Sequence, residues 1–177
     1  MFWTIRIILF VLLLIVVYQD LKWREIHWVI IPFLAILLIL YSIQENTLID
    51  VLNNSLINLS IVFIQFLFVT FWFSIKSKKL INILRQHIGL GDWLFFVCLC
   101  LAFSPINFIL FLVSAFILSL LIYLITLLIL KSTEKTVPLA GLVATILLGV
   151  LIIESVFYPG KLQNDSYITN LLGFYNV

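Results

Sequence analysis

The amino-acid sequence predicts an all-α integral membrane protein, a polytopic bundle of about six transmembrane helices. Of its 177 residues, 64% are hydrophobic and only 10% are charged, whereas soluble domains have about 45–50% apolar and about 25% charged residues. The mean hydropathy is +1.28. One water-soluble core cannot hide that much apolar surface. Because a spanning helix needs about 20 residues, the chain has room for six spans and for no sizeable soluble domain.

Six apolar runs, separated by polar segments, define the expected spans. They are 2–19, 28–43, 55–75, 89–103, 106–130 and 138–157. The fourth run is short for a crossing at 1.5 Å per residue, so we expect it to begin upstream, within 80–88, or to be supported by neighbouring helices. Residues 1–157 are expected to form one transmembrane domain, followed by a short polar tail, 158–177, on the far surface or disordered. Glu154 is expected to reach outward to the membrane surface.

Basic residues gather in the segments after the first, third and fifth runs, which a six-span chain places on one side. They are Lys22, Arg24, Lys76, Lys78, Lys79, Arg85, Lys131 and Lys135, eight of the ten Lys and Arg residues. Because cytoplasmic loops carry an excess of Lys and Arg, we expect this side to face the cytoplasm and both termini to lie outside. The net charge of +2, spread over loops, gives no case for nucleic-acid binding.

Two acids fall on that same side, each at the end of an expected span. Asp20 closes the first run, and Asp92 opens the fourth in the stretch Gly89-Leu90-Gly91-Asp92. Acids at such places are costly and mark functional sites. Two carboxyl groups a few ångströms apart hold one proton between them, so one can activate water while the other donates to a carbonyl oxygen. Gly89 and Gly91 would allow close backbone approach, or a positive φ, beside Asp92.

Each acid also has a structural interpretation. Asp20 can pair with Lys22 or Arg24 at the headgroup level, and Asp92 can cap a helix N-terminus and interact favourably with the helix dipole. Only the pair, taken with its flanking residues, favours catalysis. Two other functions stay open at this point. One is a small ion-coupled transporter, which would favour acids near the bilayer midplane, and the other is a non-catalytic assembly subunit.

Three stretches together resemble the type IV prepilin peptidase family, membrane aspartic proteases that carry a GxGD motif. They are Gln19 to Ile26, an acid followed by a basic segment; Gly89 to Asp92, the motif itself; and Thr136 to Ala144, similar to the opening of the family's last span. The resemblance extends over residues 20–144. The sequence departs from the family at Leu94, where a Lys is frequent, and at His27-Trp28, where Pro-Asn is common.

The resemblance implies that Asp20 and Asp92 form the catalytic pair and that Gly89, Gly91 and Arg24 shape the site or contact the substrate. It implies a prepilin-like precursor, a type IV pilin or pseudopilin with an N-terminal hydrophobic helix, cut on the cytoplasmic side of a bacterial inner membrane. Membrane lipid is the other expected partner, and no metal or organic cofactor is needed. The chain has only two cysteines, both in an apolar run, so we expect a short form without the family's Cys-x-x-Cys insert and its methyltransferase activity.

Overall fold

The computed structural model describes residues 2–78, 89–130, 138–157, 160–165 and 169. Within these residues the regular structure is entirely helical, which confirms the predicted all-α class. The elements are α1 (Phe2–Trp23), α2 (Ile30–Ser42), α3 (Leu48–Ser77), α5 (Leu90–Leu99), α6 (Pro105–Leu130), α7 (Leu139–Phe157) and the 3₁₀ helix η1 (Lys161–Gln163).

Four of these helices, α1, α3, α6 and α7, are long and apolar enough to cross a membrane. The other two, α2 and α5, are apolar but have only 13 and 10 residues. At 1.5 Å per residue α5 is about 15 Å long, half of the roughly 30 Å of a bilayer core. The protein is therefore a helical membrane bundle in which two short helices complete four long ones.

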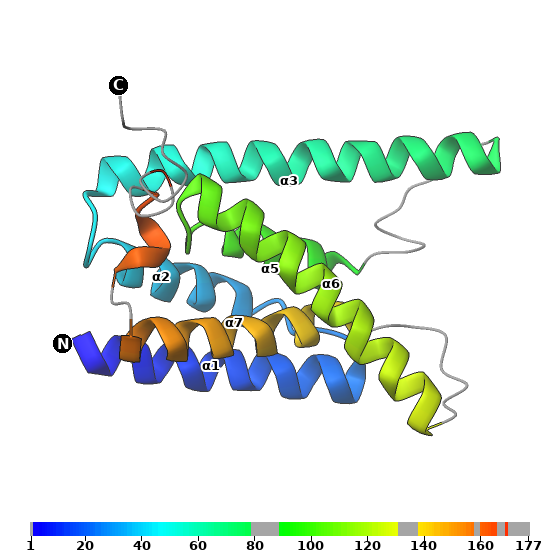
Figure 1. Ribbon diagram of the computed structural model, residues 1–177, viewed down its shortest axis with the longest axis horizontal. Coiled ribbons are helices and arrows are strands. Elements are labelled where there is room, and N and C mark those ends of the chain that lie inside the picture. Colours follow the sequence, from blue (N-terminus) through cyan, green and yellow to red (C-terminus); the bar gives the residue numbers. More distant parts are fainter. Residues whose placement is uncertain (1, 79–88, 131–137, 158–159, 166–168, 170–177) are drawn as a thin grey trace.

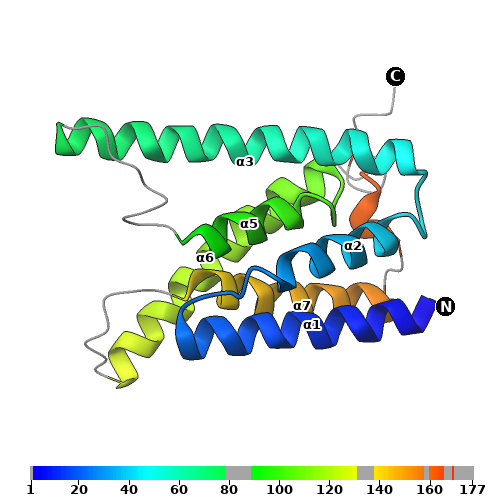
Figure 2. The same cartoon turned by 180° about the vertical axis from the view of Figure 1, so that it is seen from behind.

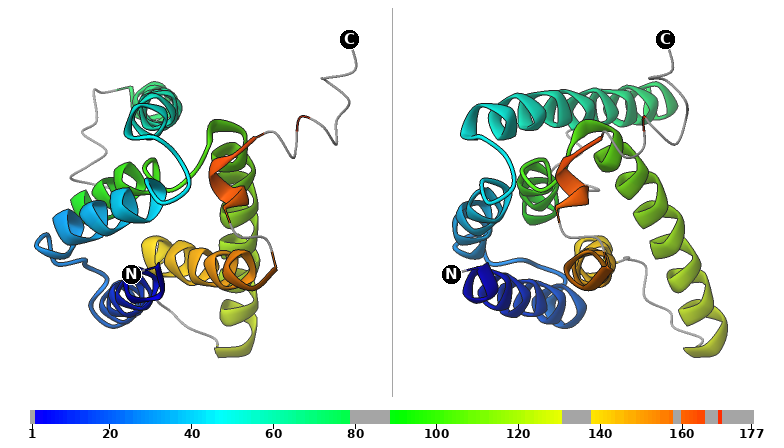
Figure 3. Two further views of the ribbon diagram at one scale, coloured as in Figure 1. Left: turned by 90° about the vertical axis from the view of Figure 1, so that its left-hand side faces the viewer. Right: turned by 60° about the vertical axis from the view of Figure 1, so that its left-hand side comes forward.

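The helices α1, α2, α5, α6 and α7 contribute most of the buried core, whereas α3 lies at the periphery (Figures 1 and 3). The most extensive contact is between α1 and α7, followed by that between α1 and α2. Fully buried aliphatic and aromatic side chains fill the interior, among them Leu9, Leu13, Leu34, Phe95, Phe108 and Leu147. Many other apolar side chains are exposed on the outside, and α3 carries a large share of them, as expected for a surface that faces lipid.

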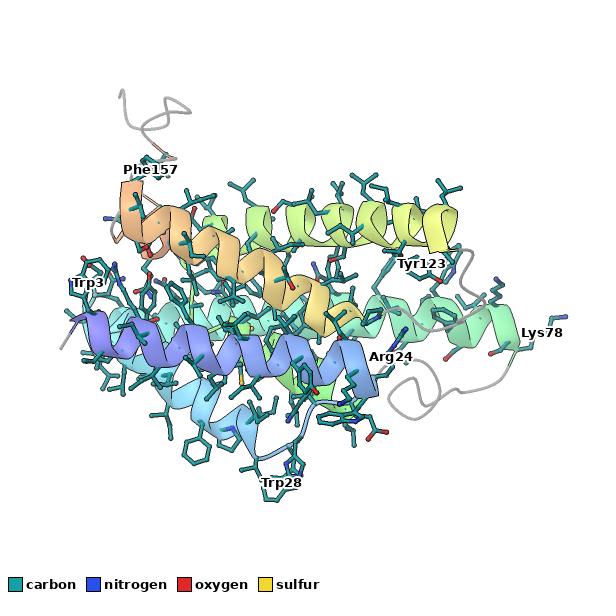
Figure 4. The ribbon with its side chains drawn as sticks, turned by 90° about the horizontal axis from the view of Figure 1, so that it is seen from below. Trp3, Arg24, Trp28, Lys78, Tyr123 and Phe157 are labelled. Atoms are coloured by element: carbon teal, nitrogen blue, oxygen red, sulfur yellow. The ribbon has the colours of Figure 1, made fainter. Side chains whose placement is uncertain are left out.

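Successive helices run in opposite directions, so the bundle has two distinct ends (Figures 1 and 2). The Asp20 end carries the C-terminal ends of α1, α3 and α6 and the N-terminal ends of α2, α5 and α7. The Glu154 end is opposite and includes the N-terminus of α1 and the C-terminal end of α7. Figure 4 shows Arg24 and Lys78 toward the first of these ends, and Trp3 and Phe157 at the second.

Four basic residues that predicted the orientation, Lys22, Arg24, Lys76 and Lys78, therefore belong to the Asp20 end. The other four, Lys79, Arg85, Lys131 and Lys135, lie outside the described residues.

The helix α5 ends at Leu99 rather than at Phe103, and residues 100–104 form a non-helical break that is largely buried in the bundle. Non-helical backbone at membrane depth needs partners from the protein. Side chains from other elements provide the donors: Asn58 to the carbonyls of Cys100 and Phe103, Ser42 to that of Leu101, and Gln163 to that of Ala102. Support of the short fourth run by its neighbours is thus confirmed, and an upstream start within 80–88 lies outside the described residues.

Part of the polar tail belongs to the bundle instead of lying on its surface. Leu162 packs against the core, and the side chain of Gln163 is only 6% exposed. The carboxylate of Asp165 accepts hydrogen bonds from the backbone N–H groups of Ile106 and Asn107. It therefore caps the first turn of α6, where N–H groups have no partner within the helix.

Candidate functional site

Asp20 lies near the C-terminal end of α1 with its side chain 2% exposed. Its carboxylate accepts a short hydrogen bond from the backbone N–H of Gly141, in the first turn of α7. The first N–H groups of a helix lack internal partners, and the helix dipole favours an anion there. A Cβ at residue 141 would lie 3.0 Å from Oδ2 of Asp20 and 3.1 Å from its Cβ. A side chain at residue 141 would therefore have to displace the Asp20 side chain by a few tenths of an ångström.

Asp92 lies in the first turn of α5, outside the four described helices that are long enough to cross a membrane, and is half-buried. Its burial and, second, the nearby charge of Asp20 raise the pKa of Asp92 to about 6. Such an effect requires that the two carboxyl groups be close together. Among the described residues, the carboxyl group of Asp92 has no hydrogen-bond partner. The fold therefore brings together two acids that the sequence places in the first and fourth apolar runs.

The two glycines of the GxGD stretch have different surroundings. A Cβ at Gly91 would lie 3.2 Å from the Cβ of Ile26 and 3.3 Å from its carbonyl oxygen, whereas one at Gly89 would meet only Oδ2 of Asp92, at an ordinary 3.7 Å. The close backbone approach at Gly91 is made by the chain's own Ile26, which brings the turn that holds Asp92 against the segment following Asp20. The expected positive φ is not found, because Gly89 has φ −63° and ψ 144° and Gly160 is the one described glycine with positive φ.

Arg24 ends α1 in the left-handed conformation, with φ 59°. Its backbone N–H donates to the carbonyl oxygen of Asp20 at 3.0 Å, as at many helix C-termini. Its positive charge acts favourably on the Asp20 carboxylate, so the expected electrostatic partnership of these two residues is present. Lys22 is directed elsewhere, since its Nζ donates to the hydroxyl of Tyr18 at 2.7 Å.

An apolar cavity of about 520 Å³ opens beside this site. Its lining residues come mainly from α3 and α5: Val62, Ile64, Gln65, Phe66, Phe68, Val69, Trp93, Phe96, Phe116 and Leu139. Trp93 directly follows Asp92, and Leu139 lies in the same helix turn as Gly141. The cavity lies against α3, whose outer face carries exposed apolar side chains, and its lining includes the neighbour of Asp92 in the chain but neither acid.

A second buried acid lies at the other end of the bundle. Glu154 is 4% exposed and accepts hydrogen bonds from the hydroxyl of Tyr41 and from the backbone N–H of Gly160, the latter at 2.8 Å. The buried Arg6 guanidinium lies 5.7 Å from the centroid of the Tyr41 ring. The expectation that Glu154 reaches outward is therefore wrong, because donors from α2 and from the segment after α7 hold its carboxylate inside.

Sequence reasoning also missed Gly141 as a site residue, although it noted the stretch that contains it. The sequence signal that could have identified it is its position three residues after Pro138, in the first turn of an expected span. The free N–H groups of a helix's first turn can bind an anion. Among the described residues, no group of three or more His, Cys, Asp or Glu side chains could hold a metal ion.

Comparisons with models of protein families, with curated proteins and with solved structures found no match to this chain. The function of the site must therefore be argued from its own geometry.

Proposed function

We propose that this chain is a membrane-embedded aspartic endopeptidase of the type IV prepilin peptidase kind, which cuts the leader from prepilin-like precursors. The observation that carries the proposal is the proximity of Asp20 and Asp92, which is close enough for the charge of Asp20 to act on Asp92. Two such carboxyl groups titrate as a pair and retain one proton between them. That is the protonation state that amide hydrolysis by two acids requires.

In this mechanism the ionised acid takes a proton from the attacking water, and the protonated acid donates to the oxygen of the scissile carbonyl. When the resulting tetrahedral intermediate collapses, one of its hydroxyl groups gives a proton back to the acid that is now ionised, the C–N bond breaks, and the leaving amine takes up a proton from the other acid, so the pair again holds one proton. The Gly141 N–H fixes the orientation of the Asp20 carboxylate. The apolar cavity beside Trp93 would accept part of the hydrophobic helix of the precursor.

The Asp20 end is assigned to the cytoplasmic face of a bacterial inner membrane. It carries Lys22, Arg24, Lys76 and Lys78, and cytoplasmic segments are rich in such residues. Cleavage would accordingly take place where the leader of the precursor emerges from the membrane into the cytoplasm.

The decisive experiment replaces each acid by its amide in the purified protein. Asp20→Asn and Asp92→Asn should each slow cleavage of a prepilin-like precursor by at least about 10³-fold, within the range that acid–base groups contribute. The matched control is Asp50→Asn, which changes an exposed acid in the first turn of α3 at the opposite end of the bundle. Mass spectrometry of the new N-terminus measures cleavage. Full activity in either site variant would refute the proposal.

The same variants separate the two other functions. An ion-coupled transporter predicts cation uptake into vesicles that depends on the two acids, with no cleavage of any precursor. A non-catalytic assembly subunit predicts that Asp20→Asn and Asp92→Asn leave the assembled machinery working.

A further inference from the structure

Three buried polar side chains hold the break between α5 and α6, and we call Ser42, Asn58 and Gln163 the clasp. They come from α2, from α3 and from the tail, and their exposed fractions are 1%, 0% and 6%. Together they donate to the four successive carbonyl groups of residues 100–103. Asn58 makes two of these bonds, at 3.1 Å to Cys100 and 2.8 Å to Phe103.

The members of the clasp also support one another. The Gln163 amide nitrogen donates to the hydroxyl of Ser42, and its Oε1 accepts from Nδ2 of Asn46 at 3.0 Å. The backbone N–H of Ser104 donates to the carbonyl of Leu162 at 3.0 Å. The break is thus joined by directional bonds to three separate parts of the fold.

These bonds act on a helix whose other contacts are mostly apolar. Apolar packing is non-directional, whereas a buried polar group fixes the register of one helix against another. The helix α5 has only 10 residues, with the clasp at its C-terminal end and Asp92 in its first turn. A displacement of residues 100–103 would therefore move α5 as a unit and shift the carboxyl group of Asp92.

We propose that Asn58 and Gln163 are positioning residues that fix the depth of α5 and so hold Asp92 beside Asp20. Neither touches the acids, and both act through α5. The catalytic consequence rests on the function proposed above, but the placement of the helix does not. The tail segment 160–165 is in this view a working part of the site, although it lies at the opposite end of the bundle.

Disulfide formation tests this placement without any need for catalysis. A Cβ at residue 91 would lie 3.2 Å from that of Ile26, near the roughly 3.5–4.5 Å typical of disulfides. Ile26→Cys and Gly91→Cys are introduced after the native Cys98 and Cys100 are changed to Ala. Asn58→Leu or Gln163→Leu should then slow cross-linking at least about tenfold, since a shift by one turn, about 5.4 Å, takes the two sulfurs out of range.

The matched control is Asn53→Leu, the same change at an exposed position of α3, which should leave the rate unaltered. Asn58→Gln keeps an amide donor and should restore part of the cross-linking. In the enzyme without the added cysteines, Asn58→Leu should lower kcat with little change in KM and should shift the pH profile of cleavage, because the coupling of two acids depends on their separation. A merely destabilising change would not move that profile.

Unchanged cross-linking in both Asn58→Leu and Gln163→Leu would overturn the proposal. If Asn58→Leu fails to insert into the membrane, Gln163→Leu decides alone, since residue 163 lies outside the spanning helices. If the clasp variants cross-link more slowly but the unsubstituted protein cuts no precursor, the positioning role is supported and the peptidase function is refuted. Failure of the positioning proposal and failure of the peptidase proposal can therefore be told apart.

Discussion

Buried acids mark both ends of the bundle, and they are held in different ways. At the Glu154 end each carboxylate oxygen has its own donor, since Oε2 accepts from the Tyr41 hydroxyl and Oε1 from the Gly160 N–H. At the Asp20 end, Oδ2 of Asp20 accepts from the Gly141 N–H, and a second acid, Asp92, lies near it. At one end each oxygen of the buried acid has its own donor, and the opposite charges of Arg6 and Glu45 both lie near its partner Tyr41, whereas at the other end a second acid lies beside the first.

This difference separates a structural acid from a pair suited to chemistry. A buried polar network whose members are all satisfied makes a fold rigid, and Glu154 joins α7 to α2 and to the tail in that way. Two acids brought together destabilise the folded state unless they share a proton, and such arrangements cluster at functional sites. Burial alone therefore does not identify the functional acid, and the character of its partners does.

Changing the buried acid to its amide should have the largest effects, and these should be opposite at the two ends: loss of cleavage at Asp20 and loss of stability at Glu154. Asp20→Asn should abolish cleavage and barely alter stability, because its side-chain oxygen can still accept from Gly141 and the repulsion with Asp92 is removed. Glu154→Gln should retain cleavage and lower the free energy of unfolding by about 1–3 kcal/mol, since one buried donor loses its acceptor. Thermal unfolding in detergent and precursor cleavage are measured on both. Equal loss of stability in the two variants would contradict the comparison.

Two glycines of α7, one beside Asp20 and one far from it, should show the next largest difference in cleavage rate when each is changed to alanine. Gly141→Ala places a methyl group 3.0 Å from Oδ2 of Asp20, so it should lower kcat/KM by about 10²-fold, or some 2.7 kcal/mol of transition-state stabilisation. Gly149→Ala in the same helix meets nothing within 4 Å and should leave cleavage unchanged. Cleavage rates of the two variants, normalised to the inserted protein, measure the difference. Similar rates would show that a Cβ at residue 141 is accommodated without displacing the Asp20 carboxylate.

The sequence was sufficient for the fold class and for the end of the bundle at which the acids meet. Apolar run length predicted α6 and α7 almost to the residue, and the alternation of direction followed from the number of runs. The meeting of Asp20 with Asp92 could be expected because both lie at the basic ends of their runs. These properties depend on hydropathy and charge, which any single residue carries independently of its neighbours in space.

What the sequence left hidden depends on pairs of residues far apart in the chain. Glu154 faces inward because Tyr41 and Gly160 supply donors, and nothing near position 154 reports either partner. The end of α5 at Leu99 similarly depends on Asn58 and Gln163, whose side chains hydrogen-bond the carbonyl groups of the break. The apolar run continues to residue 103, so hydropathy alone predicts helix through most of this break. The role of Gly141 appears only when a Cβ is placed against Asp20. Close approach and hydrogen-bond satisfaction are properties of the packed structure.

The two glycines beside Asp92 should differ by a smaller factor. Gly91→Ala crowds the backbone of Ile26 at 3.2–3.3 Å, whereas Gly89→Ala makes only an ordinary contact at 3.7 Å. We expect kcat/KM to fall about tenfold for Gly91→Ala, which is some 1.4 kcal/mol, and less than about threefold for Gly89→Ala. Steady-state kinetics on both variants measures this. The reverse order would mean that Gly89 is needed for substrate rather than for packing.

The smallest expected effect concerns the titration of Asp92. The charge of Asp20 disfavours ionisation of Asp92 and, after burial, is the second cause that raises its pKa to about 6. Asp20→Asn removes that charge, so the pKa of Asp92 should fall while the contribution of burial remains. Because Asn cannot ionise, the variant should show a single titration in place of the coupled behaviour of a pair. Carbon-13 NMR of labelled aspartate carboxyl groups measures the shift, with Asp50→Asn, far from Asp92, as the control that should leave it unmoved. An unaltered Asp92 titration in Asp20→Asn would mean that the two acids do not interact, and the Asp20 end would then have no more claim to catalysis than the Glu154 end.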